Sequence, residues 1–443
     1  MCLLIVVAVP AMAQQSSRLS LSQAVAVALE KNPLRKAAAA EEKASIADIH
    51  SARSAFMPAI TFTESATRGN DPVYVFGTRL RQGRFTAADF ALNSLNHPAP
   101  IGDFVTRFGG QWNIFDSFHS TLNFRRAKQM NEAAAQQLAR VDQQTVFRVV
   151  QAYYGILLAD KQVELAEQTL KTAQAVLDRS RSRVEAGMVV ESDALAAQVN
   201  VAMRQQDAIR ARNAAAFARA QLTTALGVPS GIYEPAETLA EHPLPPLALD
   251  EAEARALKLR PDLKQIELQT NAQETGVKLA KAAFGPRVNA FGSWELDNAS
   301  FAANGSNNWV AGAEIQLDLF SGGRKLAQLS HEKAMLERAN EMKRAATDNV
   351  RLEVQQAFYD NDAARQMLDV ARASVAQAEE SLRINQNRYD TGLTTITDLL
   401  RAEDAARSSR TNYWESVFHY QTSYAALELA SGSLNLQSPV VTQ

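Results

Sequence analysis

The six histidines are the first side chains to consider for metal binding or acid–base catalysis. None has the His-x-x-x-His or a similar ligand spacing; they are His50, His97, His119, His242, His331 and His419. The sequence also shows no phosphate-binding glycine loop and no nucleophile elbow, and Ser321-Gly322-Gly323 is better explained as a loop between a strand and a helix. The one cysteine, Cys2, excludes a disulfide framework and a cysteine-based metal site. These residue types predict a protein that is not an enzyme and uses no cofactor or metal.

The most specific arrangement of polar residues occurs in two similar segments, RVEAGMVVESDAL and RYDTGLTTITDLL. In each segment a glycine follows an arginine by four residues and precedes an aspartate by six, which pairs Gly187 with Asp193 and Gly392 with Asp398. A glycine after a long helix is typical of a helix C-terminus, and a carboxylate is favourable near the N-terminal end of the next helix. Each segment is therefore a predicted turn between two helices, and a further role of the aspartates stays open at this point.

Both turns follow a long stretch in which apolar or small residues recur at near-heptad spacing. The first stretch contains Val141, Thr145, Val149, Ala152, Ile156, Ala159, Val163, Ala166, Leu170, Ala173, Leu177, Ser180 and Val184. The second contains Val354, Ala357, Ala364, Leu368, Ala371, Val375, Ala378, Leu382 and Tyr389. No proline interrupts residues 101–228, so a continuous helix from Ser120 to Glu185 would be roughly 100 Å long. Periodicity alone is equally compatible with an ordinary soluble coiled coil.

Four shorter segments alternate between apolar and polar residues, as strands with two different faces do. We expect strands near residues 57–67, 104–116, 286–297 and 309–320. In the third segment Phe291 breaks the alternation. About eleven tilted strand residues rise roughly 28 Å, close to the apolar band of an outer membrane. Four strands cannot close a membrane barrel, so strands in a membrane would need partners from other chains.

The chain is a duplication of one sequence pattern. Residues 19–63 match residues 247–291 at an offset of 228, and the register from Ile114 onward matches at an offset of 205. We therefore divide the chain into a first repeat at 14–227, a proline-rich extended linker at 228–246, a second repeat at 247–432 and a tail at 433–443.

One segment has no counterpart in the second repeat. Residues 68–103 lie between the two strands of the first repeat and are too long for a tight turn. We expect them to form a long loop of that hairpin, whose function the sequence does not reveal.

Composition narrows the class of protein. The 46 Lys and Arg nearly balance the 48 Asp and Glu, and the net charge of -2 gives no electrostatic case for a nucleic-acid partner. A hydrophobic content of 46% argues against wholesale disorder. No run of 18 apolar residues is present, so we expect no conventional transmembrane helix. The start, MCLLIVVAVPAMA, predicts a secretory signal over residues 1–13 with Gln14 as the mature start, although it lacks a basic n-region.

The duplicated order and its motifs together resemble the TolC-type outer-membrane efflux family. The resemblance covers residues 19 to about 432 and includes LEKNPLRKAAAAEEKASIADIHSARSAFMPAI, QWNIFDSF, AYYGILLAD and DLFSGGR besides the two turn segments. It implies an α+β membrane protein in which long coiled-coil-like helices form a tunnel and four strands per chain contribute to a trimeric, 12-stranded barrel. The homotrimer would sit among outer-membrane lipid and extend into the periplasm.

The resemblance also implies a function. It is that of a passive exit duct in a tripartite efflux or type I secretion system, working with a periplasmic adaptor and an inner-membrane pump. The adaptor would dock on the two turns, which form the periplasmic tip and contain Gly187, Met188, Val189, Val190, Gly392, Leu393, Thr394 and Thr395. The alternative, from another class, is a coiled-coil structural protein of the envelope that forms no channel.

Five residues near the tip stand at positions of a gate in the family: three match those positions and two differ from them. Tyr389 and Asp193 match positions whose hydrogen bond holds the tip closed, and Asp398 matches an acidic position that lines the constriction. Thr394 stands where the best-known member has an arginine, and Arg401 stands where it has another aspartate. The resemblance therefore implies a gate at Asp193, Tyr389, Asp398 and Arg401. The two departures do not support the same set of closing contacts as in the best-known member.

Overall fold

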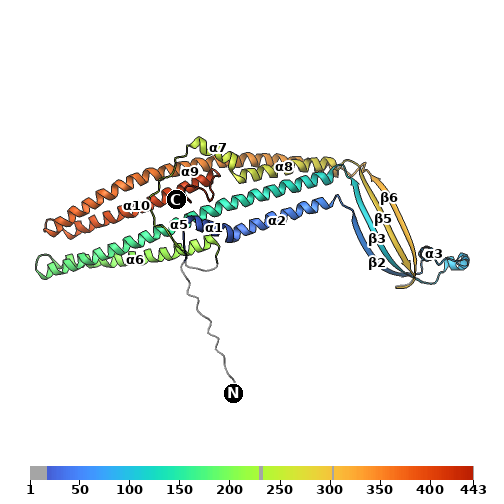
Figure 1. Ribbon diagram of the computed structural model, residues 1–443, viewed down its shortest axis with the longest axis horizontal. Helices are drawn as coiled ribbons and strands as arrows, with labels where there is room; N and C mark the ends of the chain where they lie inside the picture. Colours follow the sequence, from blue (N-terminus) through green and yellow to red (C-terminus); the bar gives the residue numbers. More distant parts are fainter. Residues whose placement is uncertain (1–16, 229–232, 302–303, 443) are drawn as a thin grey trace, which may run out of the picture. The chain divides into compact units, whose positions relative to one another are not determined.

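The computed structural model describes residues 17–228, 233–301 and 304–442; the expected signal at residues 1–13 lies outside them. The first repeat contains β1 (Ser17–Leu19), α1 (Leu21–Lys31), α2 (Pro33–Ser54), β2 (Ala59–Gly69), α3 (Pro72–Arg81), η1 (Ala87–Phe90), α4 (Leu92–Asn96), β3 (Ile101–Phe115), α5 (His119–Glu185) and α6 (Glu191–Leu226) (Figure 1). After β4 (Tyr233–Pro235), the second repeat contains α7 (Leu249–Leu259), α8 (Pro261–Ala282), β5 (Arg287–Asn298), β6 (Ser306–Gln316), α9 (Arg324–Asp390) and α10 (Ile396–Ala430).

The duplication is visible in the lengths of the helices. The pairs α1 and α7, α2 and α8, and α5 and α9 have 11, 22 and 67 residues in both repeats. The last pair, α6 and α10, has 36 and 35 residues. The expected helix from Ser120 to Glu185 is confirmed, since α5 is continuous over this range.

The first helix of each repeat is broken, whereas the sequence predicted a single helix there. Pro33 and Pro261 each begin a new helix, and the residues before them, Asn32 and Arg260, have extended ψ angles of 127° and 119°. Proline has no N–H to donate to the preceding turn, and its ring disfavours the helical conformation of the residue before it. Each repeat therefore starts with two helices that meet at a proline.

The four long strands form one antiparallel sheet in the order β2-β3-β5-β6, with bounds within a few residues of those expected. The register places Phe62, Phe108, Trp294 and Trp309 in one row across the sheet. These four side chains are exposed, from 39% for Trp294 to 78% for Trp309, so the predicted apolar face is confirmed. Phe291 lies on the other face and packs over Gly312, where an added Cβ would be 2.8 Å from its ring.

The described residues divide into two compact units, and each contains parts of both repeats. The strand unit holds residues 42–133 and 266–343, with the sheet and residues 68–103. That segment does join β2 to β3, and it contains α3, η1 and α4 rather than irregular backbone alone. The helical unit holds the residues up to Glu41, residues 134–265 and the residues from Arg344 onward. Among helices of the described residues, none combines the length and the apolar character needed to cross a membrane.

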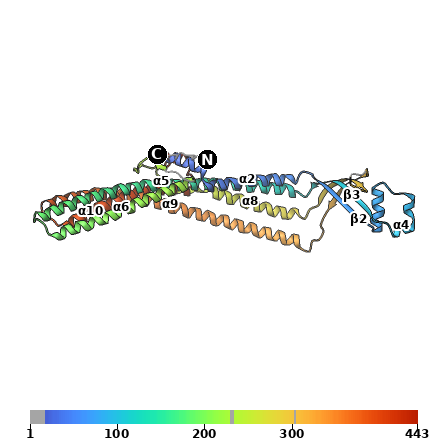
Figure 2. The same ribbon diagram turned by 90° about the horizontal axis from the view of Figure 1, so that it is seen from below.

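The helical unit has a continuous core built on the predicted seam. In it, α5 runs beside α6 and α9 beside α10 (Figure 2). Val149, Ile156 and Val354 of the seam are fully buried. The segment expected to be a tail joins this core, because Leu434, Val440 and Val441 are at most 1% exposed. The described part of the linker is extended, as predicted, and its β4 pairs in parallel with β1.

Candidate functional site

The two predicted turns have the same backbone structure. Gly187 and Gly392 have φ angles of 70° and 75°, in the left-handed region that glycine adopts without strain. After α5, Gly187 N–H donates to Val184 and Met188 N–H donates to Arg183. After α9, the equivalent bonds run from Gly392 to Tyr389 and from Leu393 to Arg388. Both helices thus end in a Schellman motif, and the predicted glycine C-termini are confirmed.

The helices that return from the turns begin differently. Thr395 caps α10, since its Oγ1 accepts from Asp398 N–H at 3.2 Å and donates to Asp398 Oδ2 at 2.7 Å. The corresponding residue before α6 is Val190, which has no side-chain acceptor. Asp193 is half-buried in the first turn of α6, and its N–H donates to the Val190 carbonyl.

The pKa of Asp398 is held below its ordinary value. Hydrogen bonds from Thr395 and Thr394 are the main causes, and the nearby Arg401 guanidinium adds to them. Arg401 lies 3.9 Å from the carboxylate, and its side chain is 79% exposed. Asp398 therefore keeps its negative charge at neutral pH. Because Arg401 is largely exposed, solvent screens its attraction to that charge, and the ion pair is weak.

The expected bond between Tyr389 and Asp193 is wrong for the chain as described. Tyr389 is 3% exposed, and its hydroxyl lies 3.2 Å from Ser180 Oγ, which is fully buried on α5. The seams of α5 and α9 face each other here, so the tyrosine points into the cluster that includes Val176, Leu177 and Leu399. Asp193 is at the start of α6 and takes no part in this contact.

Two arginines of α5 complete the contact between the repeats. Arg183 donates to the Tyr389 and Asp390 carbonyls at 2.8 and 2.9 Å, which satisfies the C-terminal end of α9. Its guanidinium also stacks on the Tyr389 ring at 4.8 Å. Arg179 forms an ion pair with Asp390 at 2.8 Å. Arg179, Ser180 and Asp390 were not among the site residues expected from the sequence, although Ser180 at an apolar seam position was a signal of a buried hydrogen bond.

A second link joins the returning helices α6 and α10. The side chain of Arg204 is 7% exposed and contacts Asn200, Asp207 and, across the helices, Asp404 at 2.7 Å. A buried guanidinium needs such partners for its donors. No feature of the sequence distinguished this arginine from the other charged residues of α6.

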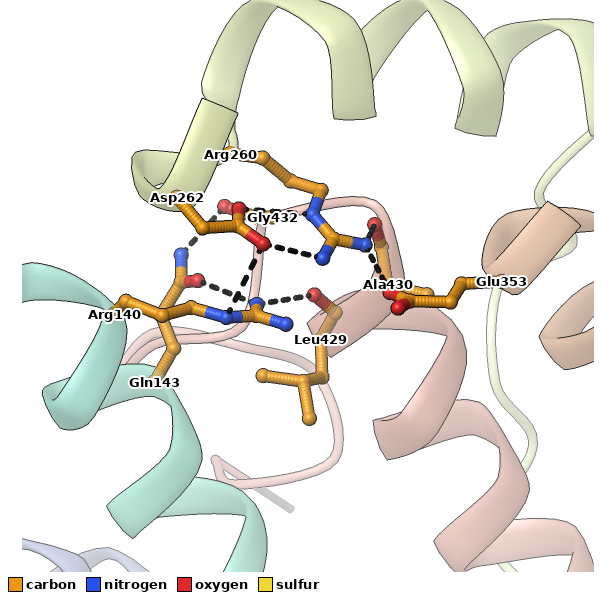
Figure 3. Close-up of polar contacts among 8 residues, drawn as sticks. All are labelled: Arg140, Gln143, Arg260, Asp262, Glu353, Leu429, Ala430 and Gly432. Atoms are coloured by element: carbon orange, nitrogen blue, oxygen red, sulfur yellow. Dashed lines mark hydrogen bonds and ion pairs between the residues drawn. The ribbon is translucent and has the colours of Figure 1, made fainter. Parts of the chain in front are cut away.

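A third polar network, in the second repeat, joins the break between α7 and α8 to α9 and to the end of α10 (Figure 3). Arg260, with a side chain 2% exposed, forms a two-bond contact with Asp262 and an ion pair of 2.6 Å with Glu353 of α9. It also donates to the Ala430 carbonyl at the end of α10. Burial lowers the pKa of Arg260, but its bonds to Asp262 and Glu353 outweigh this and raise it.

The first repeat has an equivalent contact at its own helix break. Asn32 donates to the Ala225 carbonyl at 2.9 Å, and Ala225 corresponds to Ala430 in the duplicated register. In each repeat, the glycine two residues after this alanine lets the end of the last helix approach the helix break closely. A Cβ on Gly227 would lie 2.5 Å from Asn32 Cα, and one on Gly432 would lie 2.9 Å from Arg260 N.

The family described as outer membrane efflux protein matches residues 24–228 and 254–433, one segment in each repeat. The chain belongs to the outer membrane efflux protein family. The resemblance to TolC-type proteins is thereby confirmed, and the chain is an outer-membrane channel protein that extends into the periplasm. The alternative of a structural coiled coil that forms no channel is set aside.

Individual relatives agree with this family over nearly the whole chain. The alkaline protease secretion protein AprF of Pseudomonas aeruginosa is 22% identical over 92% of this chain and 83% of its own length. Protein CyaE of Bordetella pertussis is 26% identical over 96% of this chain and 86% of its own. Among solved structures, the Campylobacter jejuni CmeC outer membrane channel has a TM-score of 0.81 at 17% identity, covering 95% of this chain and 87% of that one. This last likeness shows a shared fold.

Proposed function

We propose that three copies of this chain form the exit duct of a tripartite efflux or type I secretion system. Cargo would reach the duct from an inner-membrane pump through a periplasmic adaptor and leave passively across the outer membrane. The observation that carries the proposal is the repetition of one exposed turn at the ends of both helical hairpins. We propose no catalytic role, and we assign the choice of cargo to the partners, since relatives of this chain include a protease secretion protein.

The turns present apolar side chains that the chain itself does not cover. Met188, Val190 and Leu393 are 75%, 64% and 70% exposed. Isolated exposed apolar residues are common, but here they recur at equivalent turns of both repeats. Gly187, Val189, Gly392, Thr394 and Thr395 would shape the docking turns, whereas Met188, Val190 and Leu393 would contact a helical hairpin of the adaptor.

Photo-crosslinking in cells tests this docking surface. A photoreactive amino acid at position 188 or 393 should cross-link to a periplasmic adaptor, identified by mass spectrometry, and Met188→Ser with Leu393→Ser should reduce the complex several-fold without reducing outer-membrane insertion. Val73, 81% exposed on α3, provides the matched control position for both the cross-linker and the serine substitution. Cross-linking to no adaptor, or an unchanged complex in the double variant, would contradict the proposal.

We further propose that Asp398 lines the constriction of the duct, with Arg401 beside it. Threefold symmetry would bring three charged carboxylates around one axis, where they attract multivalent cations. Asp398→Ala should therefore weaken block by a multivalent cation in planar-bilayer conductance, and Arg401→Ala should strengthen it. Asp369→Ala, at an exposed position of α9, is the control. Unchanged block in both test variants would show that Asp398 only caps α10.

A further inference from the structure

Two buried carboxylates lie at the end of the sheet where residues 68–103 join β2 to β3. Asp103 of β3 is 3% exposed and Asp297 of β5 is 0% exposed. Gln82, which follows α3, is 4% exposed and packs between the ends of these strands. Buried carboxylates are rare unless they are paired or bind metal ions.

The register places the two carboxylates on one face of the sheet. Val105 pairs with Asp297, and Asp103 precedes Val105 by two residues, so Asp103 and Asp297 are diagonal neighbours. Their charges are close enough to repel each other. Within the described ranges neither forms an ion pair within 4 Å, whereas the neighbouring Glu295 is paired with Arg107 at 3.3 Å. Arg81 offsets part of the charge of Asp297 from a greater distance.

Two buried oxygens of this cluster have no hydrogen-bond partner in the described chain: Asp297 Oδ1 and Gln82 Oε1. Asn308 Nδ2 donates at 2.8 Å to the other carboxylate oxygen, Asp297 Oδ2. The orientation of the Gln82 amide is fixed, because its Nε2 donates to Asp103 Oδ1 at 2.9 Å and to the carbonyls of Gly102 and Asn298 at 3.0 and 3.2 Å. A flipped amide would place oxygen against three acceptors. Both oxygens therefore need an electropositive partner that the described residues do not supply.

The side chain of Asn298 does not belong to this set. Its Oδ1 is also without a partner, but alternation along β5 directs the side chain to the opposite face from Asp297. The described residues contain no group of three or more His, Cys, Asp or Glu suited to a metal ion. A cation site here consequently depends on the amide oxygen as well as on the two carboxylates.

We propose that Asp103, Asp297 and Gln82 Oε1 bind one Ca²⁺ ion. Carboxylate and amide oxygens are hard ligands, which Ca²⁺ accepts in flexible geometry, with water completing the shell. Mg²⁺ fits less well because it demands a near-ideal octahedron at shorter ligand distances and gives up its own waters reluctantly. The ion compensates the two carboxylates and ties residues 68–103 to β3 and β5. The site is independent of the proposed tip and gate.

Calorimetric titration of the detergent-purified full chain with CaCl₂, after treatment with a chelator, tests the site. We expect one saturable Ca²⁺ per chain, with Mg²⁺ binding at least tenfold more weakly. Asp103→Asn and Asp297→Asn keep the shape of the side chains and should each weaken Ca²⁺ binding at least tenfold. Glu64→Gln is the control, since Glu64 is an exposed carboxylate of β2 that pairs with Thr106 on the opposite face.

Thermal unfolding of the same samples separates a metal site from a purely structural one. Ca²⁺ should raise the melting temperature of the native chain and of Glu64→Gln, and should leave both asparagine variants unchanged. In chelator the asparagine variants should melt at or above the native temperature, because the repulsion between the carboxylates is relieved. Absence of saturable Ca²⁺ binding, a preference for Mg²⁺, equal binding by all variants, or melting of the asparagine variants below the native chain in chelator would each overturn the proposal.

Discussion

At the scale of single residues, one buried hydroxyl pair joins the repeats near the tip. Tyr389→Phe removes the bond to Ser180 and should lower the free energy of unfolding by about 1 kcal/mol, because Ser180 Oγ loses its buried partner. Thermal unfolding of the single and double variants should show coupling between Tyr389→Phe and Ser180→Ala, and additive effects for Tyr389→Phe with Asp193→Ala. Non-additive effects of Tyr389→Phe with Asp193→Ala, and additive effects with Ser180→Ala, would instead support the Tyr389–Asp193 bond expected from the sequence.

A buried carboxylate predicts a pH dependence of stability. Glu428 is 6% exposed, and burial raises its pKa from 4.5 to about 7, only partly opposed by Ser438 and Arg255. Because the folded-state pKa is the higher one, Glu428 destabilises the fold increasingly as pH rises from 4.5 to about 7. Glu428→Gln should raise the free energy of unfolding at pH 8 by roughly 3 kcal/mol at most and leave it unchanged at pH 4.

The measurement is thermal unfolding of the native chain and of Glu428→Gln across this pH range. Glu251→Gln is the matched control, since Glu251 is an exposed carboxylate of α7 that pairs with Arg255. Parallel pH profiles for the native chain and Glu428→Gln would refute the assignment.

At the scale of the elements, the break between α7 and α8 depends on Arg260. Arg260→Ala leaves Asp262 and Glu353 without their main partner and should lower the free energy of unfolding by about 3 kcal/mol. Arg260→Lys should recover only part of this loss, because an ammonium cannot reproduce the two-bond contact with Asp262. Arg383→Ala, at an exposed i,i+3 pair of α9 with Glu380, should cost under about 0.5 kcal/mol. Equal melting temperatures for the Arg260 and Arg383 variants would contradict this role.

At the scale of the whole molecule, the sheet needs partners at both edges. In the order β2-β3-β5-β6, no strand of the described residues lies beside the outer sides of β2 and β6 in the sheet. Unpaired backbone groups cost several kcal/mol each in lipid, so we expect strands of other copies to cover these edges. Native mass spectrometry in detergent should give a three-chain species, with a heated sample as the monomer control. A monomer that retains its β signal in circular dichroism would contradict the trimer.

Much of the candidate site followed from local sequence. The glycine turns, the returning helices and Asp398 as an early helix residue were all expected, because glycine conformation and helix-end preferences act within a few residues. The hydrogen-bond partner of Tyr389 was not predicted correctly. Ser180 lies 209 positions away in the sequence, and no local signal favours it over Asp193. Packing of Tyr389 into the cluster with Val176 and Leu177 of α5 decided that pairing.

Local sequence signals were enough to predict the elements and their duplication. Periodicity of two or near 3.5, proline and glycine are local signals, so strands and long helices appear close to their expected positions. In contrast, the set of charged residues that become buried depends on how these elements pack together. Arg260, Arg204 and Asp297 look like ordinary surface residues in the sequence, yet they are at most 6% exposed. Their burial depends on contacts between elements far apart in the chain, as when Arg260 reaches Glu353 across 93 residues and Ala430 across 170.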